Sequence, residues 1–345
     1  MIPHSRPTIG KEETEAALAV LRTGQIAQGE RVTAFEKALA EQVGVGNAAA
    51  VSSGTAALQL ALLALEIGEG NEVVIPSFVC SALLHAVRAV RAVPVTADID
   101  RETLNIDVRD LRRRLTKKTG AVIVPHLFGL PADIAPIVAL GIPVIEDCAQ
   151  ALGSSYDDAP TGSFGILSVF SFYATKVICT GEGGMVAGND ARLIAKIRDL
   201  REYDEREDDR PRFNLKMTDL QAALGLSQLQ RLPIMIARRR EIAEYYDASL
   251  RSLPVSLPAC PPRSEPIHYR YVIRTGRAAD LLAAGNAAGI AYRRPVFKPL
   301  HRYLGLDGYP ETEAAFAECV SLPIYPSLRN TEVNTILRHL RSVLG

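Results

Sequence analysis

The sequence has no excess of charge of either sign. Its 345 residues carry 39 Lys and Arg against 39 Asp and Glu, which gives a formal net charge of zero. Nucleic-acid-binding domains commonly gather an excess of Lys and Arg on one face, so the balance argues against nucleic acid as a partner. Arginine runs at 112–114 and 238–240 lie in segments with a helical pattern and are interpreted as solvated faces.

Cysteine pairs and long apolar runs are also lacking. The five cysteines form no CxxC pair and have no zinc-like spacing to a histidine, so we expect no metal site and reduced thiols. Residues 1–13 lack the apolar core of a signal peptide, and the most apolar stretch, residues 55–68, is too short to span a bilayer. These features predict a soluble, cytoplasmic protein with no membrane partner.

What the sequence does contain, between residues 48 and 190, is an alternation of short apolar runs with helical patterns. Continuous apolar strands separated by helices predict βαβ units and a mostly parallel sheet covered on both faces, an α/β fold. Ligands of such sheets bind at the carboxyl ends of the strands, so chemistry is expected just after each run. The runs lie at 47–53, 72–77, 93–100, 121–127 and 142–149.

The rest of the chain predicts helices and a second, smaller domain. Helical patterns cover 192–203 and 218–232, and Pro233 is expected to open a separate helix over 234–250, because proline is tolerated in a first helical turn. A strand-like segment, a helix at 278–288 and a terminal helix follow, as in a small α+β domain. We therefore divide the chain into a large domain, 1–232, and a smaller one, 233–345.

Three groups of residues at the expected strand ends suggest a cofactor site. Ser53, Gly54 and Thr55 open a helix after the first apolar run, and a helix N-terminus offers unpaired N–H groups to a phosphate, although N-capping by serine explains the same pattern. Asp147 ends a later apolar run, where its carboxylate can pair with a cationic ring nitrogen or simply cap a turn. Gln150 lies three residues further along the chain.

The third group is FSFYATKVICTGEGG, in which Lys176 stands between an apolar strand and a glycine cluster. A desolvated lysine can attack a carbonyl and form a Schiff base, whereas an isolated lysine is more often a surface amine. Ser171, on the incoming strand, can add a hydroxyl to the phosphate site. Together the groups supply what pyridoxal 5'-phosphate requires, namely a phosphate cradle, a pyridinium partner and an imine-forming amine.

A dinucleotide fingerprint is a competing motif. Residues 44–49, GVGNAA, fit the pattern GxGxxA, but that fingerprint must follow a strand and open a helix. Here a helix-like segment precedes the glycines and a strand follows them. The context therefore argues against nicotinamide binding.

The sequence resembles the DegT/DnrJ/EryC1/StrS family of pyridoxal-phosphate-dependent sugar aminotransferases, whose motifs it contains in the same order. The resemblance covers most of the chain and is carried by SSGTAAL, IPSFVCSALLHAV, VPVTADID, VIEDCAQALGS, TGSFG, FSFYATK, GEGGMV and FNLKMTDLQAALGLSQL. It implies the fold type I transferase architecture, like that of aspartate aminotransferase. It also implies a homodimer with active sites at the subunit interface.

The resemblance also implies a role for individual residues. Lys176 corresponds to the Schiff-base lysine, Asp147 to the partner of the pyridine nitrogen, and Gln150 to a neighbour of the cofactor's phenolic oxygen. Phosphate ligands are implied at Gly54, Thr55 and Ser171, and at Asn214 contributed by the other subunit. Cys80 stands where the family often places an aromatic residue that stacks on the cofactor ring. The segment 289–305 resembles the family's substrate side, with candidates for a nucleotide-sugar diphosphate at Arg293, Arg294, Lys298 and His301.

The implied reaction is transamination from an amino donor, with glutamate expected, to a keto sugar in amino-sugar or polysaccharide biosynthesis. Lys176 would be both anchor and base. One alternative is the family's sugar dehydratase branch, which has histidine where this chain has Lys176. Another is a non-catalytic ligand-binding sensor on the same fold. The acceptor's sugar, nucleotide and aminated carbon stay open, and a ketocyclitol remains an alternative acceptor.

Overall fold

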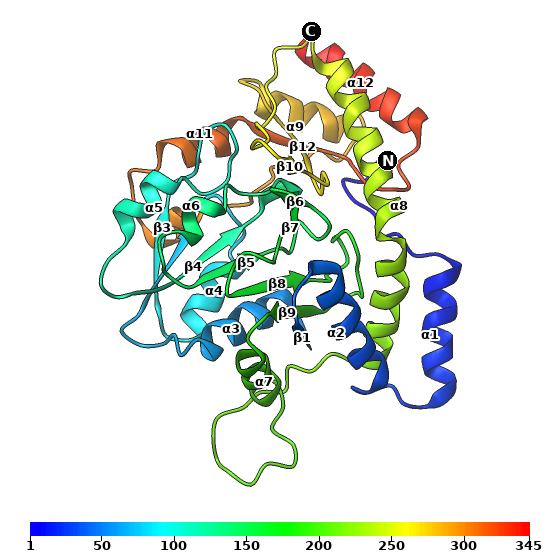
Figure 1. Cartoon of the computed structure of the whole chain (residues 1–345). Coiled ribbons are helices and arrows are strands. Elements are labelled where there is room, and N and C mark those ends of the chain that lie inside the picture. The colour runs from blue at the N-terminus through cyan, green and yellow to red at the C-terminus, as the bar shows by residue number, and fades with distance from the viewer.

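A computed structural model describes all 345 residues and is centred on a sheet of seven strands (Figure 1). Strands β8, β5, β4, β2 and β3 run parallel, and β9 is antiparallel to both of its neighbours, β1 and β8. The predicted α/β, mostly parallel sheet is therefore confirmed. In spatial order the strands are β1 (Asn47–Val51), β9 (Gly184–Gly188), β8 (Leu167–Ser171), β5 (Val144–Asp147), β4 (Thr119–Pro125), β2 (Glu72–Pro76) and β3 (Val93–Ala97).

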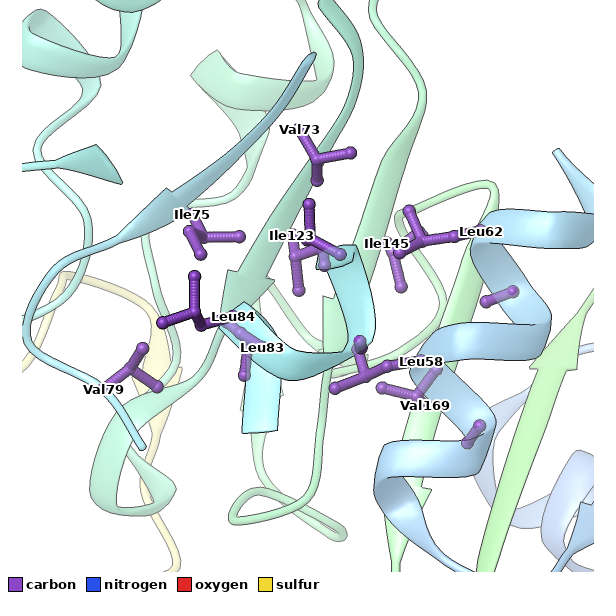
Figure 2. Packing of buried hydrophobic residues seen from close by; sticks show 14 of the residues in the cluster. Leu58, Leu62, Val73, Ile75, Val79, Leu83, Leu84, Ile123, Ile145 and Val169 are labelled. Atoms are coloured by element: carbon purple, nitrogen blue, oxygen red, sulfur yellow. The ribbon is translucent and has the colours of Figure 1, made fainter. Parts of the chain in front are cut away.

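Alternating side chains of the strands send apolar groups to both faces of the sheet. On one face the sheet packs against α3 (Gly54–Ala64), α4 (Ala82–Ala89) and α7 (Ala191–Leu200). Figure 2 shows Leu83 and Leu84 of α4 near Ile123 of β4, and Leu62 of α3 near Ile145 of β5, all in one cluster. The opposite face is covered by α2 (Glu30–Val43) at the β1 end, and by α5 (Val108–Arg114) and α6 (Ala135–Val138) near β4.

One long helix, α8 (Asp219–Leu250), joins the sheet to a second core. The expectation that Pro233 opens a new helix is wrong, because Pro233 lies inside α8, at an exposed position. Met235 and Ile236 of α8 pack into the sheet core, while Tyr246 and Leu250 pack into the second core. Figure 1 shows α8 as a rod with α1 (Lys11–Thr23) beside it. The predicted boundary at 232 and 233 falls within this helix and stays a prediction.

The C-terminal region forms the predicted small α+β arrangement. A two-stranded antiparallel sheet, β11 (Tyr271–Arg274) with β12 (Cys319–Leu322), packs against α9 (Ala278–Ala287) and the terminal helix α12 (Asn330–Leu344). None of the helices combines the length and the apolarity that crossing a bilayer requires. The remaining short elements are η1 (Leu127–Gly129), β6 (Ser155–Tyr156), β7 (Ala159–Pro160), β10 (Ser264–Glu265), α10 (Leu300–Leu304) and α11 (Pro310–Glu318).

Candidate active site

Lys176 lies on a loop between β8 and β9 that protein hydrogen bonds hold in place. Its backbone N–H donates to the Tyr173 carbonyl at 2.8 Å. On the far side of the loop, the Gln228 side chain accepts from the Cys179 N–H at 2.9 Å and donates to the Cys179 carbonyl at 3.0 Å. Because Gln228 belongs to α8, the long helix fixes the loop that presents the lysine.

The structure brings most of the predicted cofactor residues around one cavity of about 260 Å³. This cofactor cavity lies at the carboxyl ends of β5 and β8, where ligands of parallel sheets are expected. Its wall includes Ser53, Gly54, Thr55, Cys80, Asp147, Ser171 and Lys176. These residues come from three stretches of the chain besides the one that carries Ser171 and Lys176.

The N-terminus of α3 forms one end of the cavity. Ser53 caps the helix, since its hydroxyl accepts from the Ala56 N–H at 3.1 Å, and the Ala57 N–H donates to the Ser53 carbonyl. The N–H groups of Gly54 and Thr55 precede these bonds and are free for an anion. A Cβ atom on Gly54 would lie 2.7 Å from the Cβ of Ser171, so only glycine lets the helix approach the serine this closely. Capping and anion binding are thus compatible here.

Asp147 is a buried carboxylate that lacks a cationic partner in ion-pair contact within the chain. Its Oδ1 accepts from the Ala149 N–H at 3.0 Å, which is the turn contact expected of a capping aspartate, and Oδ2 makes no hydrogen bond within the chain. Burial raises the pKa of Asp147, although the Ala149 N–H and the charge of Lys176 act in the opposite direction. A cation bound against this carboxylate would relieve the cost of burying it, so the residue fits a protonated ring nitrogen.

Glu146, the residue before Asp147 on β5, is buried and hydrogen-bonded to His126. His126 Nδ1 accepts from the Ala132 N–H at 3.0 Å, so Nε2 carries the proton and donates to Glu146 at 3.0 Å. Burial works to raise the pKa of Glu146, but the hydrogen bonds from His126 and from backbone N–H groups outweigh it and hold the pKa below its usual value. Because protein groups already occupy these nitrogens and oxygens, the pair fixes the end of β5 and does not offer free metal ligands.

Gln150 lies next to the lysine but outside the main cavity. It lines a small adjoining space together with Lys176, and its Oε1 accepts from the Phe128 N–H at 2.9 Å. Phe128 has a φ of 64°, a left-handed conformation that is strained for a bulky residue. The Gln150 hydrogen bond helps to hold this conformation beside the site.

Asn214 is exposed and does not line the cavity of its own chain. The carbonyl of its neighbour Leu215 accepts from the Ser52 N–H at 2.8 Å, which places this segment beside the end of β1. The implied role of Asn214 requires a second subunit and stays a prediction.

The predicted substrate residues lie on a segment away from the cofactor cavity, and none of the four lines it. Arg294 lies over the Phe316 ring at 4.8 Å, and Lys298 over the Tyr303 ring at 4.4 Å. Arg293 is exposed, and its backbone pairs with Ser321.

His301 is the one buried member of that set. Its Nδ1 contacts the Ser77 hydroxyl at 2.7 Å, its Nε2 contacts Glu313 at 2.7 Å, and its ring stacks on Tyr309 at 4.5 Å. With both nitrogens engaged, the geometry favours the packing interpretation of His301. Since Ser77 leads into the loop that carries Cys80, His301 ties the C-terminal region to the cofactor loop.

Tyr269 and Arg270, just before β11, were not identified from the sequence, where their segment was interpreted only as a strand. The Tyr269 hydroxyl contacts the Thr175 hydroxyl at 3.2 Å, and Lys176 Nζ lies 5.2 Å from the Tyr269 ring centroid. Burial works to raise the pKa of Tyr269, but the charges of Lys176 and Arg270 and other contacts outweigh it, so the pKa is lowered. Buried Arg239 of α8 donates to the Tyr269 carbonyl and fixes this segment.

Comparison with known proteins supports the same chemistry. Residues 7–341 match the model of the DegT/DnrJ/EryC1/StrS aminotransferase family. The GDP-perosamine synthase of Escherichia coli O157:H7 is 36% identical over 354 residues, which cover 96% of this chain and 95% of that protein. The spore coat polysaccharide biosynthesis protein SpsC of Bacillus subtilis strain 168 is 34% identical over 378 residues, 99% of this chain and 97% of that protein.

Solved structures agree with the fold and with the cofactor. The putative sugar aminotransferase Spr1654 from Streptococcus pneumoniae, in its PMP form, superposes with a TM-score of 0.95 at 28% identity, covering 99% of both chains. The same protein is also known in a PLP form. The aminotransferase TlmJ from Streptoalloteichus hindustanus superposes with a TM-score of 0.94 at 33% identity, covering 99% of this chain and 98% of that one.

Proposed function

Because the chain belongs to the DegT/DnrJ/EryC1/StrS aminotransferase family and is a pyridoxal-phosphate-dependent sugar aminotransferase, we propose that Lys176 and Asp147 are its catalytic residues and that its acceptor is a nucleotide-linked keto sugar. The observation that carries the assignment is the convergence of Lys176, Asp147, Ser171 and the α3 N-terminus on one cavity. The lysine at position 176 disfavours the dehydratase branch.

The residues of the cavity fit pyridoxal phosphate. The α3 N-terminus and Ser171 would hold its phosphate, Asp147 its ring nitrogen, and Gln150 its phenolic oxygen. When bound, the cofactor supplies an aldehyde that reacts with amines and a ring that accepts electrons from the carbon that loses a proton.

Lys176 would anchor the cofactor through Nζ. Once an amino donor frees this amine, Nζ would take a proton from the donor carbon and later return one, so it would act as base and then as acid. The Tyr269 ring, whose hydroxyl contacts that of Thr175, lies 5.2 Å from Nζ and would keep the lysine oriented. Asp147 would keep the ring nitrogen of the bound cofactor protonated.

For the acceptor, we propose a keto sugar carried on guanosine diphosphate, since two relatives at 36% and 34% identity are named GDP-perosamine synthase. Incubation of the enzyme with glutamate and a panel of GDP-, UDP- and dTDP-linked keto sugars is expected to release 2-oxoglutarate fastest with a GDP-linked member. Ketocyclitols belong in the panel as the non-nucleotide alternative. Equal rates with all three carriers would contradict the guanosine assignment, and release of no keto acid with any acceptor would favour a ligand sensor.

A homodimer with shared sites is also part of the proposal. Its support is the exposure of Asn214 outside its own cavity, and a groove of about 480 Å³ beside the lysine loop, flanked by the exposed apolar residues Ile9 and Leu18 of the N-terminal region. The partner subunit's Asn214 would then complete the phosphate site.

A mixing experiment tests the shared site. When inactive Lys176→Ala and impaired Asn214→Ala subunits are exchanged, about half of the dimers are hybrids by random pairing, each with one intact site. Activity is expected to rise to about a quarter of the wild-type value for the same amount of protein. The control is each variant taken alone through the same exchange. No gain despite verified subunit exchange would place Asn214 outside the partner's site.

A further inference from the structure

Arg270 lies beside the catalytic lysine and has no acidic partner. Its guanidinium is 5.5 Å from the Tyr269 ring centroid, and Lys176 Nζ is 5.2 Å from the same centroid. The only side-chain hydrogen-bond contacts of Arg270 are with the His4 ring, at 3.3 and 3.5 Å from NH1. Two cations therefore share one aromatic ring, with no carboxylate in ion-pair contact with either.

Most other partly buried arginines of the chain have carboxylate partners, and Arg294, which has none, donates to the Phe316 carbonyl. Burying a guanidinium without an anion is costly, so such pairing is the rule in folded proteins. Arg239, which is buried without a carboxylate, contacts three backbone carbonyls instead. The paired examples are Arg201 with Glu36 at 2.6 Å, Arg212 with Asp199 at 3.1 Å, Arg231 with Glu13 at 2.9 Å and Arg274 with Glu318 at 2.8 Å.

The surroundings of Arg270 keep its charge uncompensated. His4 is partly buried and contacts it, and burial followed by the charges of Arg270 and Arg293 lowers the pKa of His4 to about 3. His4 is therefore neutral near pH 7, and its Nε2 contacts the Ser321 hydroxyl at 2.9 Å. The imidazole orients the guanidinium without neutralising it, which leaves a positive field beside the lysine.

Space for a ligand group lies next to this cation. Arg270 lines a pocket of about 320 Å³ whose wall also includes Phe128, the residue bound by Gln150. The one carboxylate of this pocket, that of Asp247, accepts from the Tyr271 hydroxyl and makes no ion pair with Arg270. The pocket is thus linked to Gln150 through Phe128, and it presents a guanidinium without a carboxylate partner.

We propose that Arg270 binds a carboxylate of the amino-acid donor, an inference that rests on the aminotransferase function proposed above. A donor's carboxylate is only a few bonds from the amine that must reach the cofactor, so its receptor has to lie close to Lys176. The diphosphate of a nucleotide-linked sugar sits on the far side of the sugar ring from the reacting ketone. It therefore requires cations further from the lysine, such as those predicted at Arg293 and Arg294. An arginine fork suits a carboxylate because it donates two parallel hydrogen bonds.

Binding of an unreactive dicarboxylate separates this role from a structural one. Glutarate is titrated into the cofactor-loaded enzyme, and its dissociation constant is measured by calorimetry for wild type, Arg270→Gln, Arg270→Lys and the exposed-surface control Arg109→Gln. We expect Arg270→Gln to weaken glutarate binding about thirtyfold or more, as for loss of a buried charge-assisted pair. Arg270→Lys should bind with intermediate affinity, and Arg109→Gln like wild type. Affinity for GDP should not change in Arg270→Gln.

The outcomes distinguish the two proposals. If the visible band of the lysine-bound cofactor is normal and glutarate affinity is unchanged in Arg270→Gln, the carboxylate role is overturned while the aminotransferase assignment stands. If GDP binding weakens and glutarate binding does not, the anion at Arg270 is the acceptor's diphosphate. A wild-type protein that never forms the band contradicts the aminotransferase assignment itself. Should Arg270→Gln not fold, Arg270→Lys decides the question by the same comparison.

Discussion

Replacing Lys176 with alanine is expected to lower turnover by at least about a thousandfold, because in the proposed mechanism one side chain supplies both the covalent anchor and the proton-transferring amine. The variant should still bind pyridoxal phosphate, since the α3 N-terminus and Ser171 do not depend on the lysine. Two measurements check this result. One is the visible absorption of the protein with added cofactor, before and after glutamate, and the other is the rate of 2-oxoglutarate release.

The matched control is Lys196→Ala, which removes an exposed lysine paired only with Glu66 at 3.0 Å and should leave both readings unchanged. Thermal unfolding of the variants shows whether a lost signal reflects lost chemistry or lost fold. Near-normal turnover in well-folded Lys176→Ala would remove the central assignment. A visible band in that variant would mean that another amine holds the cofactor.

The cofactor cavity could be predicted from the sequence because its residues obey a simple rule of parallel sheets. Ser53, Asp147 and Ser171 each end a buried apolar strand or follow it directly, and the carboxyl ends of parallel strands meet at one edge. Local sequence therefore fixed both the identity of each residue and the edge at which it lies. The structure added the distances, such as the close approach of Gly54 to Ser171.

Tyr269 and Arg270 could not be found this way. They precede β11, in the small C-terminal sheet, and the Tyr269 ring lies near Lys176 only because α8 carries the chain from one core to the other and Arg239 fixes the segment. No spacing of residues in the sequence indicates that this segment lies near the loop of Lys176. His301 was ambiguous for a related reason, since its partners Ser77 and Glu313 come from two distant segments.

The course of α8 shows tertiary packing outweighing a local signal. A proline inside a helix removes one backbone hydrogen bond and crowds the preceding turn, at a cost of about 3 kcal/mol. Pro233 faces solvent, where water can satisfy the carbonyl that loses its partner, while Leu232, Met235 and Ile236 on the same turns are buried. Burying each such side chain contributes about 1.5–3 kcal/mol, so continuing the helix is favoured.

Replacing Asp147 with asparagine is expected to lower turnover by about a thousandfold while leaving the fold intact. The amide has nearly the same shape and can keep the contact from the Ala149 N–H, but it cannot hold a proton on the cofactor's ring nitrogen. The ring then loses its capacity to accept electrons from the donor carbon. Single-turnover bleaching of the visible band by glutamate measures this step directly.

The same substitution, which should lower turnover, is expected to raise the thermal stability of the cofactor-free protein. Burial raises the pKa of Asp147, and a carboxyl with a raised folded pKa destabilises the folded state as the pH rises through that pKa. Without cofactor, Asp147→Asn is therefore expected to melt at the same temperature as wild type in acid and at a higher one near pH 8. With cofactor the order should reverse, because the ring cation then pairs with the wild-type carboxylate. Equal melting at all pH values, with and without cofactor, would show that Asp147 has no cationic partner in the enzyme.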